Sequence, residues 1–166
     1  MRPTAQKWIN NDLESDAMRA RRALNAILGS KVAPTSPGLK VLLVEDDFAD
    51  TKLIQRALQR HPHVSEVVVR NSPVRTLMEL SSGRIRPALI FLDISMPGMN
   101  GFQFLDALRR IRIMGETPVV FLTSSAFVND VGRAIRSSAR DYIVKPDTFE
   151  ELETKLDVAI RRVGPM

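Results

Sequence analysis

Five short runs of apolar, β-prone residues alternate with five helical stretches between residues 39 and 163. The apolar runs are Lys40–Val44, Val64–Val69, Ala88–Leu92, Pro118–Leu122 and Asp141–Val144. The helical stretches are Ala49–Arg60, Pro73–Ser81, Gly101–Arg112, Val128–Ser137 and Phe149–Arg162. Strand–helix alternation repeated in this way predicts an α/β fold, with a parallel sheet that is wrapped by helices on both faces.

The apolar residues indicate which side of each element is buried. The runs Val41–Val44 and Leu89–Leu92 are apolar throughout, which is typical of strands covered on both faces. In the helical stretches, two sets of residues are spaced to share one face. These sets are Leu53, Ala57 and Leu58 in the first helix, and Leu152, Leu156 and Ile160 in the last.

The chain ahead of this pattern has a different character. Residues 1–29 are predicted to be a helical extension, residues 30–38 a Pro- and Ser-containing linker, and residues 39–166 the main domain. The extension carries a narrow apolar seam at helical spacing, formed by Leu13, Ala17, Ala20, Leu24 and Ile27. Because a lone helix of about 17 residues is marginal in water, we expect it to need a packing partner, and we favour a homodimer.

Composition excludes several classes of protein. The chain of 166 residues has no cysteine, which excludes disulfides and thiolate metal sites. There is no apolar run of about 18 residues and no signal-peptide pattern, so we expect a cytoplasmic protein without membrane contact. The net charge of +5 is not concentrated in one block. The tight basic cluster near the start of the chain, Arg19, Arg21 and Arg22, fits a solvated helix face better than a nucleic-acid site.

Polar residues follow four of the predicted strands at the point where each strand ends. Glu45, Asp46 and Asp47 follow the first strand, and Asp93 follows the third. Thr123–Ser125 follow the fourth, and Lys145 follows the fifth. Each alone has an ordinary explanation as a helix cap, a turn residue or a solvated lysine. Together they fall at the carboxyl edge of one sheet, where ligands bind in open α/β folds.

This set of side chains supports a narrow range of chemistry. Clustered carboxylates repel each other unless a cation lies among them, and an all-oxygen set of ligands favours Mg²⁺. A lysine and a hydroxyl group could hold the oxygens of a phosphoryl group. A carboxylate is also a competent nucleophile toward phosphorus.

Four sequence segments resemble the signatures of response-regulator receiver domains of two-component signalling, in the family's order and spacing. They are Val41-Leu-Leu-Val-Glu45-Asp46-Asp47, Phe91-Leu-Asp93-Ile-Ser-Met-Pro97-Gly-Met-Asn-Gly101, Phe121-Leu-Thr123-Ser and Tyr142-Ile-Val-Lys145-Pro146. The resemblance covers about 125 of the 166 residues. It implies a flavodoxin-like sheet with strand order 2-1-3-4-5. It also implies a single-domain switch that receives a phosphoryl group from a sensor histidine kinase and signals to a downstream protein.

The resemblance assigns a role to each motif residue. Asp93 would be the phospho-acceptor. Asp46 would bind Mg²⁺ directly, Glu45 through water, and Ser95 through its backbone carbonyl. Asp47 falls one position too late to be a ligand in the family pattern.

The remaining motif residues would respond to the phosphoryl group. Lys145 would pair with it, and Thr123 would hydrogen-bond it. Tyr142 would be an aromatic switch on the face made by helix 128–137, strand 141–144 and helix 149–162. A cis peptide bond is expected between Lys145 and Pro146.

The stretch Leu43–Leu58 resembles regulators that serve phytochrome-type histidine kinases. The chain also departs from the common family pattern: it has Ser138-Ala139 where many relatives have Gly-Ala, and Asp147 where an aromatic residue is common. Without glycine, the shape of the preceding helix end is left open.

Other functions remain as alternatives. A magnesium-dependent phosphatase with an aspartate nucleophile is disfavoured because Ser95 stands where its second aspartate is expected. An intermediate role in a phosphorelay stays open. A DNA-binding transcription factor is disfavoured because the chain ends at Met166, soon after the last helix. His61 and His63 lack a third ligand and are expected to be surface residues.

Overall fold

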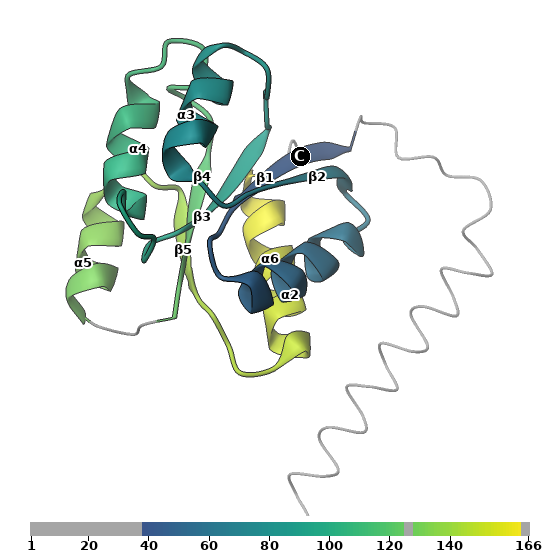
Figure 1. Ribbon diagram of the computed structural model, residues 1–166. Coiled ribbons are helices and arrows are strands. Elements are labelled where there is room, and N and C mark those ends of the chain that lie inside the picture. The colour runs from purple at the N-terminus through teal and green to yellow at the C-terminus, as the bar shows by residue number, and fades with distance from the viewer. Residues whose placement is uncertain (1–37, 125–127, 164–166) are drawn as a thin grey trace, which may run out of the picture. The chain divides into compact units, whose positions relative to one another are not determined.

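The computed structural model describes residues 38–124 and 128–163 (Figure 1). The predicted helical extension and nearly all of the linker, with the dimer expected from them, lie outside the described residues. The elements in chain order are β1 (Leu39–Val44), α2 (Phe48–Gln59), β2 (Val64–Arg70), α3 (Pro73–Ser81), β3 (Leu89–Asp93), α4 (Gly101–Arg109), β4 (Val119–Thr123), α5 (Val128–Arg136), β5 (Asp141–Val144) and α6 (Phe149–Val163).

The five strands form one parallel sheet in the order β2-β1-β3-β4-β5. Helices α2 and α6 cover one face, and α3, α4 and α5 cover the other (Figure 1). The predicted doubly wound fold and its strand order are therefore confirmed. Because every strand runs in the same direction, the carboxyl ends of β1, β3, β4 and β5 meet at one edge.

Two hydrophobic clusters lie on the two faces of the sheet, and alternate strand residues feed them. In β3, Ile90 and Leu92 pack with α4, whereas Leu89 and Phe91 pack with α2 and α6. All five residues of β3 and all five of β4 are buried. This double burial explains why both strands are apolar at every position before their last residues, Asp93 and Thr123.

The buried faces of the helices follow the sequence pattern, with one correction. Leu152, Leu156 and Ile160 of α6 are buried as predicted. In α2 the buried residues are Ile54, Ala57 and Leu58, whereas Leu53 is 48% exposed. Positions 53 and 54 are both apolar and both complete a helical face with residue 57, so packing against the sheet decides between them.

Helix α4 ends at Arg109, three residues earlier than predicted. The Arg109 guanidinium donates to the backbone oxygens of Gly115 and Thr117 at 2.8 Å, and to that of Ser138 at 2.9 Å. These bonds hold the turns that follow α4 against the chain just before β5.

The end of α5 is closed without glycine. The Ser137 hydroxyl donates to the Ala134 oxygen at 2.7 Å and accepts from the Ala139 amide at 3.1 Å. A short side chain thus satisfies the backbone groups that a glycine cap satisfies in many helices. The helix end therefore keeps a defined shape although Ser138 replaces the glycine of many relatives.

Of the two histidines expected at the surface, His63 is exposed as predicted, but the expectation was wrong for His61. Its side chain is only 7% exposed, and its Nε2 lies 3.0 Å from Asp157 Oδ1 on α6. The His63 backbone amide donates to its Nδ1 at 3.2 Å. Because Nδ1 accepts, Nε2 carries the proton, and the neutral ring satisfies both contacts.

We expect His61 to make the protein less stable in mild acid. Burial lowers the pKa of His61 below its ordinary value of about 6.5. The positive charge of Arg161 lowers this pKa further, whereas Asp157 raises it without cancelling the effect of burial. The unfolded chain therefore binds a proton first as the pH falls through that value, and folding stability is lost there. Chemical denaturation between about pH 7 and pH 5 should show this loss. The loss should be smaller in His61→Gln. In the control His63→Gln it should be only slightly reduced, because the charge of His63 is a minor cause of the lowered pKa of His61. An equal loss in His61→Gln and the wild type would contradict the assignment.

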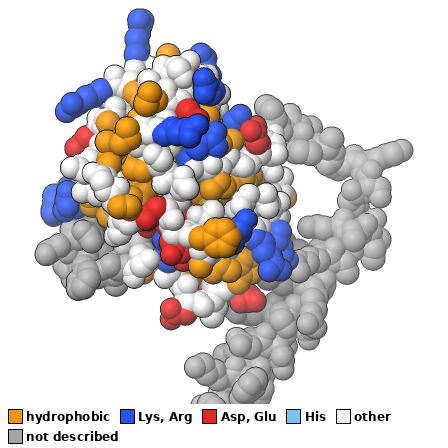
Figure 2. Space-filling view, in the orientation of Figure 1, with side chains coloured by type: hydrophobic (Ala, Val, Ile, Leu, Met, Phe, Trp, Pro, Cys, Tyr) orange, Lys and Arg blue, Asp and Glu red, His pale blue; other side chains and the backbone are white. Residues whose placement is uncertain are grey.

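No helix among the described residues is both long and apolar enough to cross a membrane. On the face drawn in Figure 2, Lys and Arg side chains are interspersed with acidic and hydrophobic ones.

Candidate functional site

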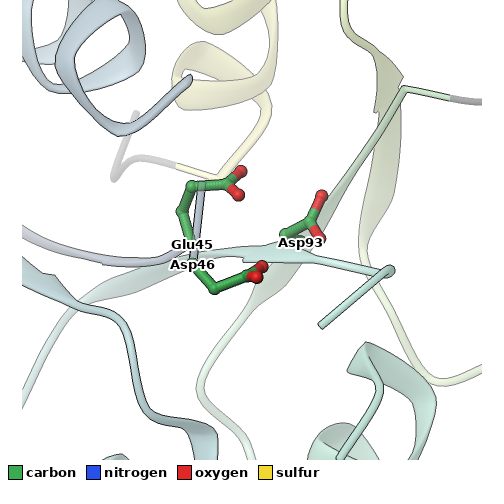
Figure 3. A group of neighbouring side chains, drawn as sticks. All are labelled: Glu45, Asp46 and Asp93. Atoms are coloured by element: carbon green, nitrogen blue, oxygen red, sulfur yellow. The ribbon is translucent and has the colours of Figure 1, made fainter. Parts of the chain in front are cut away.

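Three carboxylates meet where β1 and β3 end. Asp93 is the last residue of β3, and Glu45 and Asp46 directly follow β1. One oxygen from each of these carboxylates lies within 4.8 Å of the others. The side chains point toward a common space at the edge of the sheet (Figure 3). Asp93 and Glu45 are 3% and 1% exposed, whereas Asp46 is open to solvent.

Lys145 enters this group from the end of β5. Its backbone amide donates to the Thr123 oxygen at 2.8 Å, which extends the pairing of β4 with β5 by one residue. Its Nζ lies 2.9 Å from Asp93 Oδ1, 2.7 Å from Glu45 Oε2 and 2.7 Å from Asp50 Oδ2. The ammonium group is thus surrounded by three carboxylates, and its side chain is only 12% exposed.

The buried charges change each other's proton affinity. Burial raises the pKa of Glu45, and the nearby Asp93 raises it further, while the Lys145 ammonium opposes both effects. Burial alone would lower the pKa of Lys145. Its hydrogen bonds to Asp50, Glu45 and Asp93 outweigh that effect and raise the pKa of Lys145 above its usual value. The lysine therefore stays charged at neutral pH.

The second oxygens of the buried carboxylates are held by backbone amides. The Ser95 amide donates to Asp93 Oδ2 at 2.8 Å, and the Asp47 amide donates to Glu45 Oε1 at 3.0 Å. The orientation of both carboxylates is therefore set by the backbone. The ligand set of three carboxylates fits Mg²⁺, which prefers oxygen ligands and tolerates retained water. Lys145 balances part of their negative charge.

Thr123 and Tyr142 lie on the neighbouring strands. Thr123 ends β4 and is 1% exposed; the residue before it, Leu122, pairs with Asp93. Tyr142 lies on β5 beside Phe121 and packs, half-buried, against the cluster that covers the α4 face. The structure thus places Thr123 beside the strand that carries Asp93 and Tyr142 one strand further away.

The expected cis bond between Lys145 and Pro146 was wrong: none of the described residues has a cis peptide bond. Even before proline the trans form is favoured, by about 0.5–1 kcal/mol.

Asp50 is the site residue that the sequence reasoning missed. It lies in the first turn of α2, and Asp47 caps that helix by accepting from the Asp50 amide at 2.8 Å. Asp47 therefore has the capping role that was one of the explanations for an acidic residue after a strand. The signal for Asp50 was available, because the first turn of a helix after β1 runs along the same edge as the strand ends.

Two glycines shape the loop after β3. Gly98 has φ of 78°, a left-handed conformation that suits glycine. At Gly101 an added Cβ would lie 2.6 Å from the Asp93 backbone oxygen. The start of α4 therefore packs directly against the backbone of the proposed acceptor.

Comparison with known proteins identifies the family. The family model of the response regulator receiver domain matches residues 41–157. The chain belongs to the response-regulator receiver domains of two-component systems, a family in which phosphorylation and Mg²⁺ binding are typical.

The curated relatives include the transcriptional regulatory protein HprR of Escherichia coli (strain K12), which is 36% identical over 124 residues, covering 75% of this chain and 52% of HprR. The phosphate regulon transcriptional regulatory protein PhoB of Klebsiella pneumoniae is 39% identical over 128 residues, covering 76% of this chain and 54% of PhoB. The chain thus spans about half the length of these relatives.

Among solved structures, the phosphorylated cyanobacterial phytochrome response regulator RcpA aligns with a TM-score of 0.67 at 26% identity. The alignment covers 76% of this chain and 94% of RcpA. The chemotaxis protein CheY4 of Vibrio cholerae aligns with a TM-score of 0.62 at 26% identity, covering 73% of this chain and 98% of CheY4.

Proposed function

We propose that this chain is a phosphorylation switch that accepts a phosphoryl group from a histidine kinase on Asp93. The observation that carries the proposal is the placement of the Asp93 carboxylate. It is buried at the end of β3 and lies 2.9 Å from the Lys145 ammonium. Its oxygen also lies within 4.8 Å of carboxylate oxygens of Glu45 and Asp46, close enough for the three to bind one metal ion.

The chemistry is a transfer between two nucleophiles. A carboxylate oxygen of Asp93 forms a bond to phosphorus while the bond from phosphorus to the kinase histidine nitrogen breaks, and that nitrogen leaves with the bonding electrons. The protein's contribution is positioning and charge neutralisation. Lys145 would pair with the phosphoryl oxygens, and Thr123 would donate a hydrogen bond to one of them.

Mg²⁺ is part of the proposal. Asp46 and Asp93 would hold it directly, Glu45 through water, and Ser95 through its backbone oxygen. When bound, the ion would supply positive charge to the phosphoryl oxygens.

The experiment that tests this function is phosphorylation by acetyl phosphate and by phosphorylated histidine kinases, with and without Mg²⁺. We expect the mass gain of one phosphoryl group, only with Mg²⁺, and in a peptide that contains Asp93. Absence of labelling under all these conditions would refute the proposal. Turnover of small phosphomonoesters without a stable phosphorylated form would favour the phosphatase alternative. We infer no such turnover, since Ser95 stands in place of its second aspartate.

Asp46→Ala should weaken Mg²⁺ binding by at least about tenfold, because it removes a direct oxygen ligand. Titration of the unphosphorylated protein by calorimetry measures this effect. The matched control is Asp47→Asn, which removes a neighbouring charge while it keeps a good helix cap. Equal affinities in Asp46→Ala and the wild type would exclude Asp46 as a ligand.

We further infer that Thr123 and Tyr142 carry the signal to the face formed by α5, β5 and α6. A hydrogen bond from Thr123 to the phosphoryl group would shift its loop and favour a second packing of Tyr142. Thr123→Ala should still accept the phosphoryl group but lose most of the phosphorylation-dependent NMR shifts on this face. Shifts equal to those of the wild type would contradict this route.

The partners follow from the same chemistry. We infer a sensor histidine kinase as donor, a downstream protein as target, and a cytoplasmic location where both are accessible. The similarity to the phytochrome response regulator RcpA and the resemblance of Leu43–Leu58 support a phytochrome-type kinase as the donor. Phosphotransfer profiling against the kinases of the source organism would identify the donor. It would also separate a terminal switch from a relay intermediate.

A further inference from the structure

Lys145 has one partner that the proposed chemistry does not use. An ammonium group has three donors. In the structure its three partners are carboxylate oxygens of Glu45, Asp50 and Asp93, at 2.7, 2.7 and 2.9 Å. Glu45 and Asp93 belong to the metal-binding cluster, whereas Asp50 lies outside it.

This division of partners matters when the site is occupied. A cation among the clustered carboxylates would draw on oxygens of Glu45 and Asp93, and a phosphoryl group would occupy Asp93 itself. Of the three carboxylates, only Asp50 would then have no partner at the site other than Lys145.

Asp50 is also well placed to hold a fixed position. It lies in the first turn of α2, where its backbone amide is bound by the Asp47 cap at 2.8 Å. Its side chain is 33% exposed, so a substitution there leaves the buried core intact. Asp50 precedes Lys145 by 95 residues in the chain, and the hydrogen bond between them connects the start of α2 to the end of β5.

We infer that Asp50 is a positioning residue, which holds the Lys145 ammonium beside Asp93 before and during phosphoryl transfer. The inference rests on the proposed function of Asp93. Asp50 touches neither the phosphoryl group nor the metal; it acts through the lysine.

The test compares the rate of labelling by acetyl phosphate at saturating Mg²⁺ in a set of full-length variants. Asp50→Ala should slow labelling by roughly threefold to tenfold, the range for losing one partly exposed charged hydrogen bond. Asp50→Asn keeps an acceptor oxygen and should stay within about twofold of the wild type. Asp47→Asn removes a charge from the same turn without touching Lys145, and should have no effect.

A double-mutant cycle with Lys145→Ala shows whether Asp50 acts through the lysine. Once Lys145 is absent, adding Asp50→Ala should cause no further slowing, and the affinity for Mg²⁺ should be the same in Asp50→Ala and the wild type. The same cycle on unfolding stability should show coupling between the two residues without any phosphodonor.

The outcomes are distinct. If the wild type takes no label, the proposed function fails and this inference falls with it. If the wild type is labelled but Asp50→Ala labels at the same rate, the inference alone is wrong. A slowing that persists in the Lys145→Ala background, or that appears equally in Asp47→Asn, would also overturn it, because the effect would then be general charge or helix stability.

Discussion

Asp93→Asn is expected to abolish phosphorylation of the chain by acetyl phosphate and by any phosphorylated kinase. The amide has the volume of the carboxylate but lacks the anionic oxygen that attacks phosphorus. Lys145 keeps Glu45 and Asp50 as partners in this variant, so the protein should still fold. Intact mass spectrometry after incubation with phosphodonor and Mg²⁺ measures the result.

The matched control is Asp106→Asn, which changes an exposed aspartate of α4 in the same way. It should be labelled like the wild type. Full labelling of Asp93→Asn would mean that another residue is the acceptor, and the proposed site would have to be abandoned.

Gly101→Ala should destabilise the protein by about 2–3 kcal/mol. The added methyl group would lie 2.6 Å from the Asp93 oxygen, 3.0 Å from Ile94 Cα and 3.2 Å from Phe121 Cε1. Two of these neighbours are backbone atoms, so the start of α4 must move away from β3. Urea denaturation at neutral pH measures the loss.

Gly132→Ala on α5 is the comparison. Its nearest neighbours are the ends of the Arg136 guanidinium group, at 3.4 Å or more, which can move aside. Alanine within a helix should leave stability unchanged or raise it by up to about 1 kcal/mol. Equal stability of Gly101→Ala and the wild type would show that α4 does not depend on this close approach.

The strand ends could be predicted from the sequence because each is defined by local information. A run such as Leu89–Leu92 stops at a charged residue, and a parallel sheet brings such stops to one edge. Glu45, Asp46, Asp93 and Lys145 were therefore placed together without knowledge of any distance.

The sequence-based predictions were wrong at positions whose burial depends on residues far away in the chain. The choice between Leu53 and Ile54 depends on the angle at which α2 meets the sheet. The burial of His61 depends on Asp157, which is 96 residues away. Asp50 is different: its place in the first turn after β1 put it at the right edge of the sheet, but its contact with Lys145, 95 residues away, does not follow from that local pattern.

The separation of the core into two clusters has an evolutionary consequence. The five strands divide the buried hydrophobic residues, so that side chains packed under α2 and α6 are not those packed under α3, α4 and α5. Substitutions on one side should combine nearly additively with those on the other, because their effects on packing are separated by the sheet. A lineage can therefore change the packing under α3, α4 and α5 without disturbing the packing under α2 and α6, and the carboxyl ends of β1, β3 and β5 keep their positions at the edge of the sheet.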